Sequence, residues 1–183
     1  MSKPINKSDV KWQGNTYNFE VFDDKDFSKF KDVKQVSGFI FNDKDEMLIV
    51  KCGPNKDWCL PGGGPEKVDK TWKDTLTREL EEEADVEVEN IKPAGYVRVT
   101  TPDKNIPGKR KLGIMLRASA KVTKVKPQTI DPCTGVINER KFVPIKDFLK
   151  YCPWGENGKA QLELARKAMG IKRKIEGFFS TNP

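Results

Sequence analysis

Short apolar runs separated by turn-forming residues dominate the first half of this 183-residue chain and predict strands. Residues 36–41 and 46–50 are rich in Val, Ile and Phe and surround the polar stretch 42–45, so we expect a hairpin there. Tyr17, Phe19 and Val21 alternate with polar residues, which indicates another short strand. Further strands are expected at 58–60, 85–89, 94–100, 112–125 and 136–143.

Two segments carry helical spacing instead. Apolar residues recur at every fourth position from Trp72 to Ala84, and Thr71 is placed to cap the first turn of that helix. Residues 157–170 form an amphipathic pattern that ends at Gly170, a typical helix terminator, and a short helix is expected at 145–151. Strands followed by a helix, twice over, predict an α/β fold with a mixed sheet between helices.

Three carboxylates on the first helix lie beside its apolar stripe. At about 100° per residue, Glu79, Glu82 and Glu83 lie at the edge of the buried face, whereas a solvated acidic face should lie opposite it. Carboxylates crowded at a buried edge are costly unless a positive charge sits among them. Such oxygen-rich clusters suit a hard cation such as Mg²⁺. We therefore favour a metal site over a solvated face, with Arg78 placed to hold one carboxylate.

The acidic helix also follows a glycine-rich turn, so that one stretch of chain, Leu60 to Val86, joins both features. This stretch resembles the signature of the Nudix (MutT-like) hydrolase family, in which a glycine is followed by spaced Glu, Arg-Glu and Glu-Glu positions and an aliphatic residue. The positions that match are Arg78, Glu79, Leu80, Glu82, Glu83 and Val86, preceded by Leu60, Pro61, Gly62, Gly63, Gly64, Trp58 and Glu66.

Two positions depart from that signature. Lys70 stands where the first Glu is expected, and the adjacent Asp69 is a substitute that needs one extra loop residue, so both assignments stay open. Asp85 stands where the family has glycine at the end of the helix. Asp tolerates the left-handed conformation better than most residues, so we expect only a small loss of stability there.

The resemblance implies a Nudix-type α/β/α sandwich that hydrolyses a diphosphate linkage in a nucleoside diphosphate derivative. It implies Mg²⁺, or alternatively Mn²⁺, as the cofactor. Glu82 and Glu83 are assigned as the chief metal ligands, and Glu79 as a further ligand or base. Arg78 orients a carboxylate, and the carbonyl of Gly62 or Gly63 completes the metal shell.

Four further residues are candidates, each with an ordinary structural alternative. The resemblance places Trp58 near the floor of the substrate pocket, but a core tryptophan is an equal alternative. Lys109 and Arg110 belong to the basic, turn-rich segment 102–111, which is either a flap that meets substrate phosphates or an exposed loop. Glu139 matches an extra acid that binds metal or acts as a base in many family members, or it is a surface residue on an edge strand.

The amino-acid composition excludes several kinds of catalytic and metal site. The chain carries 34 Lys and Arg against 27 Asp and Glu, a net charge of +7, and no histidine. The missing histidine excludes Ser-His or Cys-His nucleophile pairs and His-ligated zinc. Any general base must therefore be a carboxylate, a lysine or a metal-bound hydroxide.

The length fits one globular domain over residues 1–183, with an extension or arm at 1–35, a core at 36–170 and a tail at 171–183. Four cysteines without CxxC spacing and a start without an apolar targeting segment favour a cytoplasmic protein with reduced thiols. No apolar run is long enough to span a membrane, so no membrane partner is expected.

The expected partner is a small nucleotide-type substrate, bound by a monomer or a homodimer. Two alternatives remain. A Nudix-like domain could bind a nucleotide or an RNA end without cleaving it, as the departures at Lys70 and Asp85 allow. The basic balance also leaves room for a nucleic-acid-binding domain whose acidic helix is only structural, although that charge is more often a matter of surface solubility.

Overall fold

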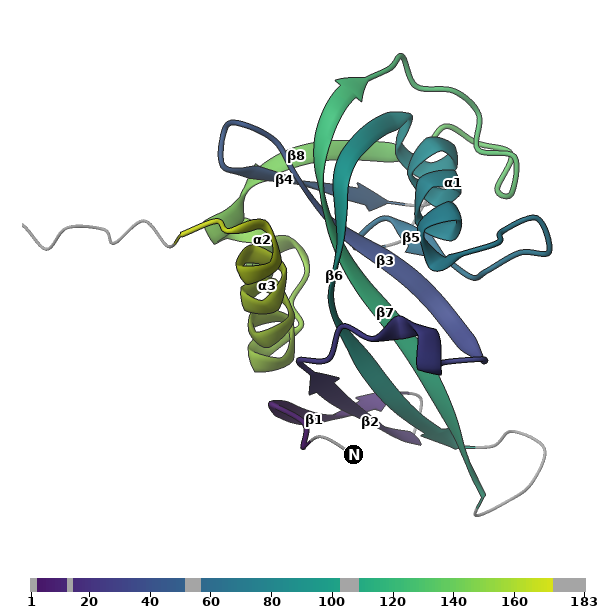
Figure 1. The fold of residues 1–183 in the computed structure, drawn as a ribbon, viewed down its shortest axis with the longest axis vertical. Coiled ribbons are helices and arrows are strands. Elements are labelled where there is room, and N and C mark those ends of the chain that lie inside the picture. The colour runs from purple at the N-terminus through teal and green to yellow at the C-terminus, as the bar shows by residue number, and fades with distance from the viewer. Residues whose placement is uncertain (1–2, 13–14, 52–56, 103–108, 173–183) are drawn as a thin grey trace, which may run out of the picture.

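A mixed sheet with helices on both faces forms the centre of the computed structural model, which describes residues 3–12, 15–51, 57–102 and 109–172 (Figure 1). The strands are β1 (Asn6–Trp12), β2 (Asn15–Phe22), β3 (Val33–Phe41), β4 (Glu46–Lys51), β5 (Gly62–Gly63), β6 (Val86–Pro102), β7 (Arg110–Val125) and β8 (Glu139–Pro144). The helices are η1 (Phe27–Lys29), α1 (Trp72–Ala84), η2 (Ile145–Asp147), α2 (Phe148–Tyr151) and α3 (Gly155–Met169). Within these ranges, no helix combines the length and apolar character needed to cross a membrane.

The strand order is β1-β2-β6-β7-β3-β4-β8, with β5 paired to β3. Strands β3 and β7 run parallel and the other paired strands run antiparallel, so the sheet is mixed, as the alternation of strands and helices predicts. Part of the segment expected to be an N-terminal arm forms the β1–β2 hairpin. That hairpin extends the sheet by pairing with β6.

Alternating side chains on the central strands create one core on each face of the sheet. On β3, Ile40 packs in a buried cluster with Leu80 of α1, whereas its neighbour Phe39 packs in a second cluster with Leu162 of α3. Successive side chains of a strand point to opposite faces, so each helix covers one face. This arrangement confirms the α/β/α sandwich.

One long strand replaces two expected ones. The predicted strands at 85–89 and 94–100 are joined in β6, which has 17 residues and pairs with β7 over most of its length. The polar residues between them form irregularities in the register with β7 rather than a turn. Asn90 takes a left-handed φ of 55° and Gly95 a φ of 155°, which lets the strand absorb the extra residues.

The last strand begins later than expected, at Glu139 rather than near residue 136. Asp131 is buried, and its carboxylate accepts hydrogen bonds from the amides of Cys133 and Thr134 and from the side chain of Asn138. These local bonds hold residues 131–138 in an irregular loop, because the side chain competes for the amides that a strand would use.

Both ends of α1 are fixed by side chains. Thr71 caps the first turn and forms a reciprocal capping box with Asp74, as the sequence predicts for Thr71. At the other end, Asp85 adopts φ 46° and ψ 48°, the left-handed conformation that usually favours glycine.

Asp85 also ties the helix to the loop that follows β7. Its buried carboxylate accepts hydrogen bonds from the amide and the hydroxyl of Thr129, both at 2.8 Å. Its carbonyl accepts a further bond from the amide of Lys126 at 2.9 Å. Because aspartate replaces the glycine of the signature at position 85, its carboxylate forms hydrogen bonds with Thr129 that a glycine could not form.

We predict that Asp85→Gly destabilises the protein by about 1–2 kcal/mol, because the lost bonds to Thr129 outweigh the relief of left-handed strain. Asp85→Asn should lose less, since its side-chain oxygen still accepts one bond. Urea unfolding of the three proteins measures both differences. A glycine variant as stable as the parent protein would show that the contacts to Thr129 contribute nothing.

Candidate active site

A single guanidinium, that of Arg78, connects the glycine-rich loop to the acidic helix. It donates to both carboxylate oxygens of Asp69, at 3.3 and 3.1 Å, and to the carbonyl of Gly64 at 2.9 Å. It also pairs with Glu82 and Glu79, each at 2.9 Å. Burial acts to lower the pKa of Arg78, but Asp69 and Glu79 outweigh it and raise that pKa. Arg78 therefore keeps its positive charge, and its guanidinium is held by contacts with both the loop and α1.

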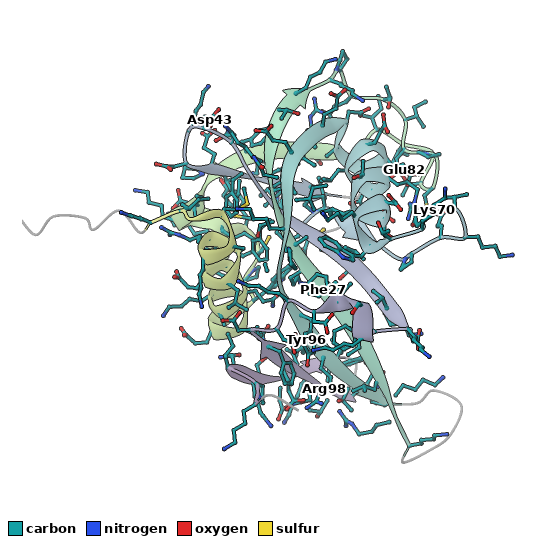
Figure 2. All side chains as sticks on the ribbon, viewed as in Figure 1. Phe27, Asp43, Lys70, Glu82, Tyr96 and Arg98 are labelled. Carbon is teal, nitrogen blue, oxygen red and sulfur yellow. The ribbon has the colours of Figure 1, made fainter. Side chains whose placement is uncertain are left out.

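Of the two candidates for the first acidic position of the signature, Asp69 is the one that contacts Arg78. Its side chain is only 4% exposed, and the hydrogen bond from Arg78 holds the pKa of its carboxyl below the ordinary value. Lys70 is exposed, and its amide donates to the side chain of Asp74 at the start of α1. Figure 2 shows Lys70 and Glu82 beside α1.

Close packing requires glycine at position 62 of the turn that precedes the helix, and Gly63 lies close to the carboxylate of Glu79. Gly62 has a φ of 140°, and a Cβ there would lie 2.2 Å from the carbonyl oxygen of Val36. A Cβ on Gly63 would lie 2.4 Å from Oε1 of Glu79. The amide of Gly62 donates to Oε2 of Glu83 at 2.7 Å. The turn therefore packs closely against the carboxylates of Glu79 and Glu83.

Glu79 is an unusual carboxyl in this site. It is 9% exposed, and its pKa is raised to about 7, mainly by burial and further by the negative charges of Glu83 and Glu82. Arg78 opposes this shift but does not cancel it. The carboxylates of Glu79, Glu82 and Glu83 therefore carry more negative charge than Arg78 balances.

The chemistry of these donors fits a hard divalent cation. Carboxylate oxygens from Glu79, Glu82 and Glu83 and backbone carbonyls of the turn are the ligands that such ions prefer. Nowhere in the described part of the chain do three Asp, Glu, Cys or His side chains stand grouped to hold an ion. Glu79 and Glu82 are turned toward Arg78, and Glu83 toward Gly62. Metal binding by these residues would therefore require their side chains to reorient.

Two candidate residues do not join this site. Arg110 donates to the carbonyls of Thr16 and Thr100, and it begins β7 at the end of the β6–β7 pair that lies away from α1 (Figure 1). Lys109 precedes it and is exposed. In this structure Arg110 and its neighbour Lys109 therefore lie at the end of the β6–β7 pair that is away from the acidic helix. Residues 103–108 of the expected flap lie outside the described residues.

Glu139 is likewise not among the contacts of the acidic helix. Its side chain is 63% exposed and pairs with Lys51 on the neighbouring strand β4 at 3.0 Å. The next residue, Arg140, donates to the carbonyls of Ala84 and Asp85 at the end of α1. In this structure Glu139 is therefore a surface residue at the start of β8, which is the ordinary structural alternative for this position.

Trp58 packs against an aromatic and a basic side chain. Its ring lies edge-on to Tyr151, with centroids 6.4 Å apart, and the ammonium of Lys141 lies 4.2 Å from its centroid. Its carbonyl accepts a hydrogen bond from the thiol of Cys152. The core alternative for Trp58 therefore agrees with its contacts.

A cavity of about 650 Å³ adjoins the turn on the α3 side of the sheet. Gly62 belongs to its lining, together with Arg117 of β7, Gln161 of α3 and Trp154. The sequence carries one signal for this cavity, the arginine at position 117 that directly follows the apolar run 112–116.

Comparison with known proteins agrees with this geometry. A family model described as NUDIX domain matches residues 31–162. No curated protein matches the chain. The Bacillus subtilis pyrophosphohydrolase BsRppH is similar in structure, with a TM-score of 0.66 and 15% identity over 90% of this chain and 99% of that chain.

Two further structures are similar over most of their length. A C. elegans Ap4A hydrolase has a TM-score of 0.51 at 19% identity and covers 75% of this chain and 98% of its own. A MutT protein from Bacillus halodurans has a TM-score of 0.51 at 15% identity and covers 71% and 80%. At these identities the likeness shows the fold.

The raised pKa of Glu79 predicts how stability depends on pH in the metal-free protein. Between an unfolded pKa of 4.5 and a folded pKa of about 7, the folded state binds an extra proton, so its stability falls as pH rises through this range. Glu79→Gln should therefore be more stable than the parent protein at pH 8, by up to about 3 kcal/mol, and only slightly more stable at pH 5.

Urea unfolding in EDTA at both pH values measures this difference. The absence of histidine makes the window favourable, since few other side chains titrate between pH 5 and 8. A variant whose advantage is equal at the two pH values would contradict the raised pKa.

Proposed function

We propose that this chain, which belongs to the NUDIX domain family, uses Mg²⁺ to hydrolyse a diphosphate linkage in a nucleoside diphosphate derivative. NUDIX domains are pyrophosphohydrolases, and they generally need a divalent metal ion. The observation that carries the proposal is the arrangement of Arg78. It connects Asp69 of the loop to Glu79 and Glu82 of α1 in one hydrogen-bonded group.

The proposed metal ligands are Glu82 and Glu83, with Glu79 and a carbonyl of Gly62 or Gly63 completing the set. When bound, Mg²⁺ would neutralise charge on the phosphates and lower the pKa of a water molecule. The chain itself positions these oxygens, since the amide of Gly62 holds Glu83 and Arg78 holds Glu82.

Glu79 is the carboxyl best suited to accept a proton in this site. A general base works best when its pKa is close to the working pH, and the pKa of Glu79 is about 7. Its carboxylate lies against Gly63, where no side chain stands between the turn and the helix. We therefore give Glu79 the role of base or additional ligand, and Arg78 the role of orienting it.

The acidic helix offers a matched control for testing these assignments. We predict that Glu82→Gln or Glu83→Gln lowers turnover at least ~10²-fold, as expected for the loss of one strong electrostatic group. Glu81→Gln should retain turnover within about twofold, because Glu81 is exposed and pairs with Lys126 instead. Product release from dinucleotides, nucleotide sugars, nucleoside triphosphates and capped RNA, with Mg²⁺ and with EDTA, provides the assay.

Unchanged turnover in both variants would refute the ligand assignments. Nucleotide binding without any cleavage across the panel would instead support the alternative of a domain that recognises nucleotides or RNA ends without hydrolysing them.

A second prediction tests the metal without using activity. At pH 8, Mg²⁺ at roughly ten times its Kd should raise the melting temperature by about 2–5 °C relative to a potassium salt of equal ionic strength. The shift should be smaller at pH 5.5, because protons compete for Glu79. Glu83→Gln should lose most of the shift and Glu81→Gln should keep it. An equal shift in all three proteins would mean that Mg²⁺ binds elsewhere.

A further inference from the structure

A buried arginine lines the cavity on the α3 side of the sheet. Arg117 lies in the middle of β7, 6% exposed, and pairs across the sheet with Ser37 of β3 and Gly95 of β6. Its neighbours along β7 pack into the cores on either side, whereas its own guanidinium meets α3 through Gln161. The cavity of about 650 Å³ therefore contains a cationic group deep inside the fold.

Within the described residues, the hydrogen bonds of this guanidinium are with uncharged groups. Nε donates to Oε1 of Gln161 at 2.7 Å, and Nη1 donates to Oε1 of Gln35 and the carbonyl of Leu116, both at 3.3 Å. Nη2 meets only the thioether sulfur of Met115, at 3.9 Å. In the part of the chain that the structure describes, no carboxylate forms an ion pair with Arg117.

Such a buried cation is costly for the folded protein. Burial lowers the pKa of Arg117 to about 10, and no neighbouring carboxylate offsets that loss of hydration. Thioether sulfur is a weak acceptor, so Nη2 is poorly satisfied, and the two hydrogen bonds of Nη1 are long at 3.3 Å. A group that is kept at a cost to stability points to a function.

The cavity joins this arginine to the acidic site. Gly62 lines the cavity and also donates its amide to Glu83, so a ligand whose phosphates lie at the acidic helix can place its other end beside Arg117. Side-chain amides extend the polar surface there, since Gln161 accepts from Arg117 and donates to Asn157.

The rest of the lining favours a flat, uncharged ring over a phosphate. Phe19, Leu60, Val97 and Trp154 contribute apolar surface, which suits a nucleobase. Asp9 and Glu156 also line the cavity and would repel an anion. A guanidinium best recognises two adjacent acceptors with its two parallel N–H groups.

We propose that Arg117 recognises the O6 and N7 acceptors of a 6-oxopurine, so that the cavity selects guanine and hypoxanthine nucleotides over adenine nucleotides. Guanine presents two acceptors on this edge, whereas adenine presents an amino donor beside N7. The inference rests on the proposed function for the nucleotide nature of the ligand, and it adds the identity of the base.

Nucleoside monophosphates test the inference apart from catalysis, because they contain no diphosphate linkage. We would titrate the full-length protein with GMP, IMP, 7-deaza-GMP and AMP in a calorimeter. GMP and IMP should bind at least ~10-fold more tightly than AMP. Loss of the N7 acceptor in 7-deaza-GMP should weaken binding by roughly 10-fold.

Two arginine variants separate recognition from general charge. Arg117→Gln should reduce the preference for GMP over AMP to less than about threefold. Arg98→Gln is the matched control, because Arg98 lies on the neighbouring strand β6, pairs with Glu20 outside the cavity and should leave the preference intact (Figure 2). AMP binding as tight as GMP binding, or a preference that survives in Arg117→Gln, would overturn the inference.

The ligand series on the parent protein decides the question even if a variant fails to fold. Equal binding of all four nucleotides, with inorganic phosphate as a competitor, would show that the cavity takes a phosphate and would overturn base recognition. Absence of binding by every nucleotide would overturn it as well. Neither result would touch the proposed function, which depends on the turnover of Glu82 and Glu83 variants.

Discussion

The ion-pair group around Arg78 is the constraint on which the candidate site depends. One guanidinium contacts a carbonyl of the glycine-rich loop, a carboxylate at the end of that loop and two carboxylates of α1. Without it, these carboxylates would repel one another at the half-buried junction between the loop and α1. The contacts of Arg78 are therefore the common origin of the position of the loop and of the charge of the site.

That common origin explains the electrostatic character of the site. Burial raises the pKa of Glu79, the negative charges of Glu83 and Glu82 raise it further, and Arg78 lowers it without cancelling the shift. The glycine turn allows this crowding because Gly62 and Gly63 leave room that any side chain would fill. The same turn borders the cavity of Arg117, so the negative site and the buried positive group are connected through a few backbone atoms.

Local features of the sequence were sufficient for much of the fold. The cap at Thr71, the terminator at Gly170 and the strand at 36–41 depend on neighbours within a few residues, and all three are confirmed. The assignment of Asp69 depended on the path of a loop, and the cavity required Gln161, 44 residues from Arg117 in sequence. Lys109 and Arg110 lie away from the acidic helix in this structure, a separation that follows from the length and direction of β6 and β7, and their role in substrate binding stays a prediction.

The contacts of Asp85 have a consequence for how this sequence can evolve. A mutation to the glycine of the family signature would remove the acceptor for Thr129, and a mutation of Thr129 would leave the carboxylate of Asp85 buried with fewer donors. Each single change is unfavourable while the other residue remains, so the two positions are epistatic. A return to glycine at position 85 is therefore accessible only after the loop that contains Thr129 has acquired another way to hold the end of α1.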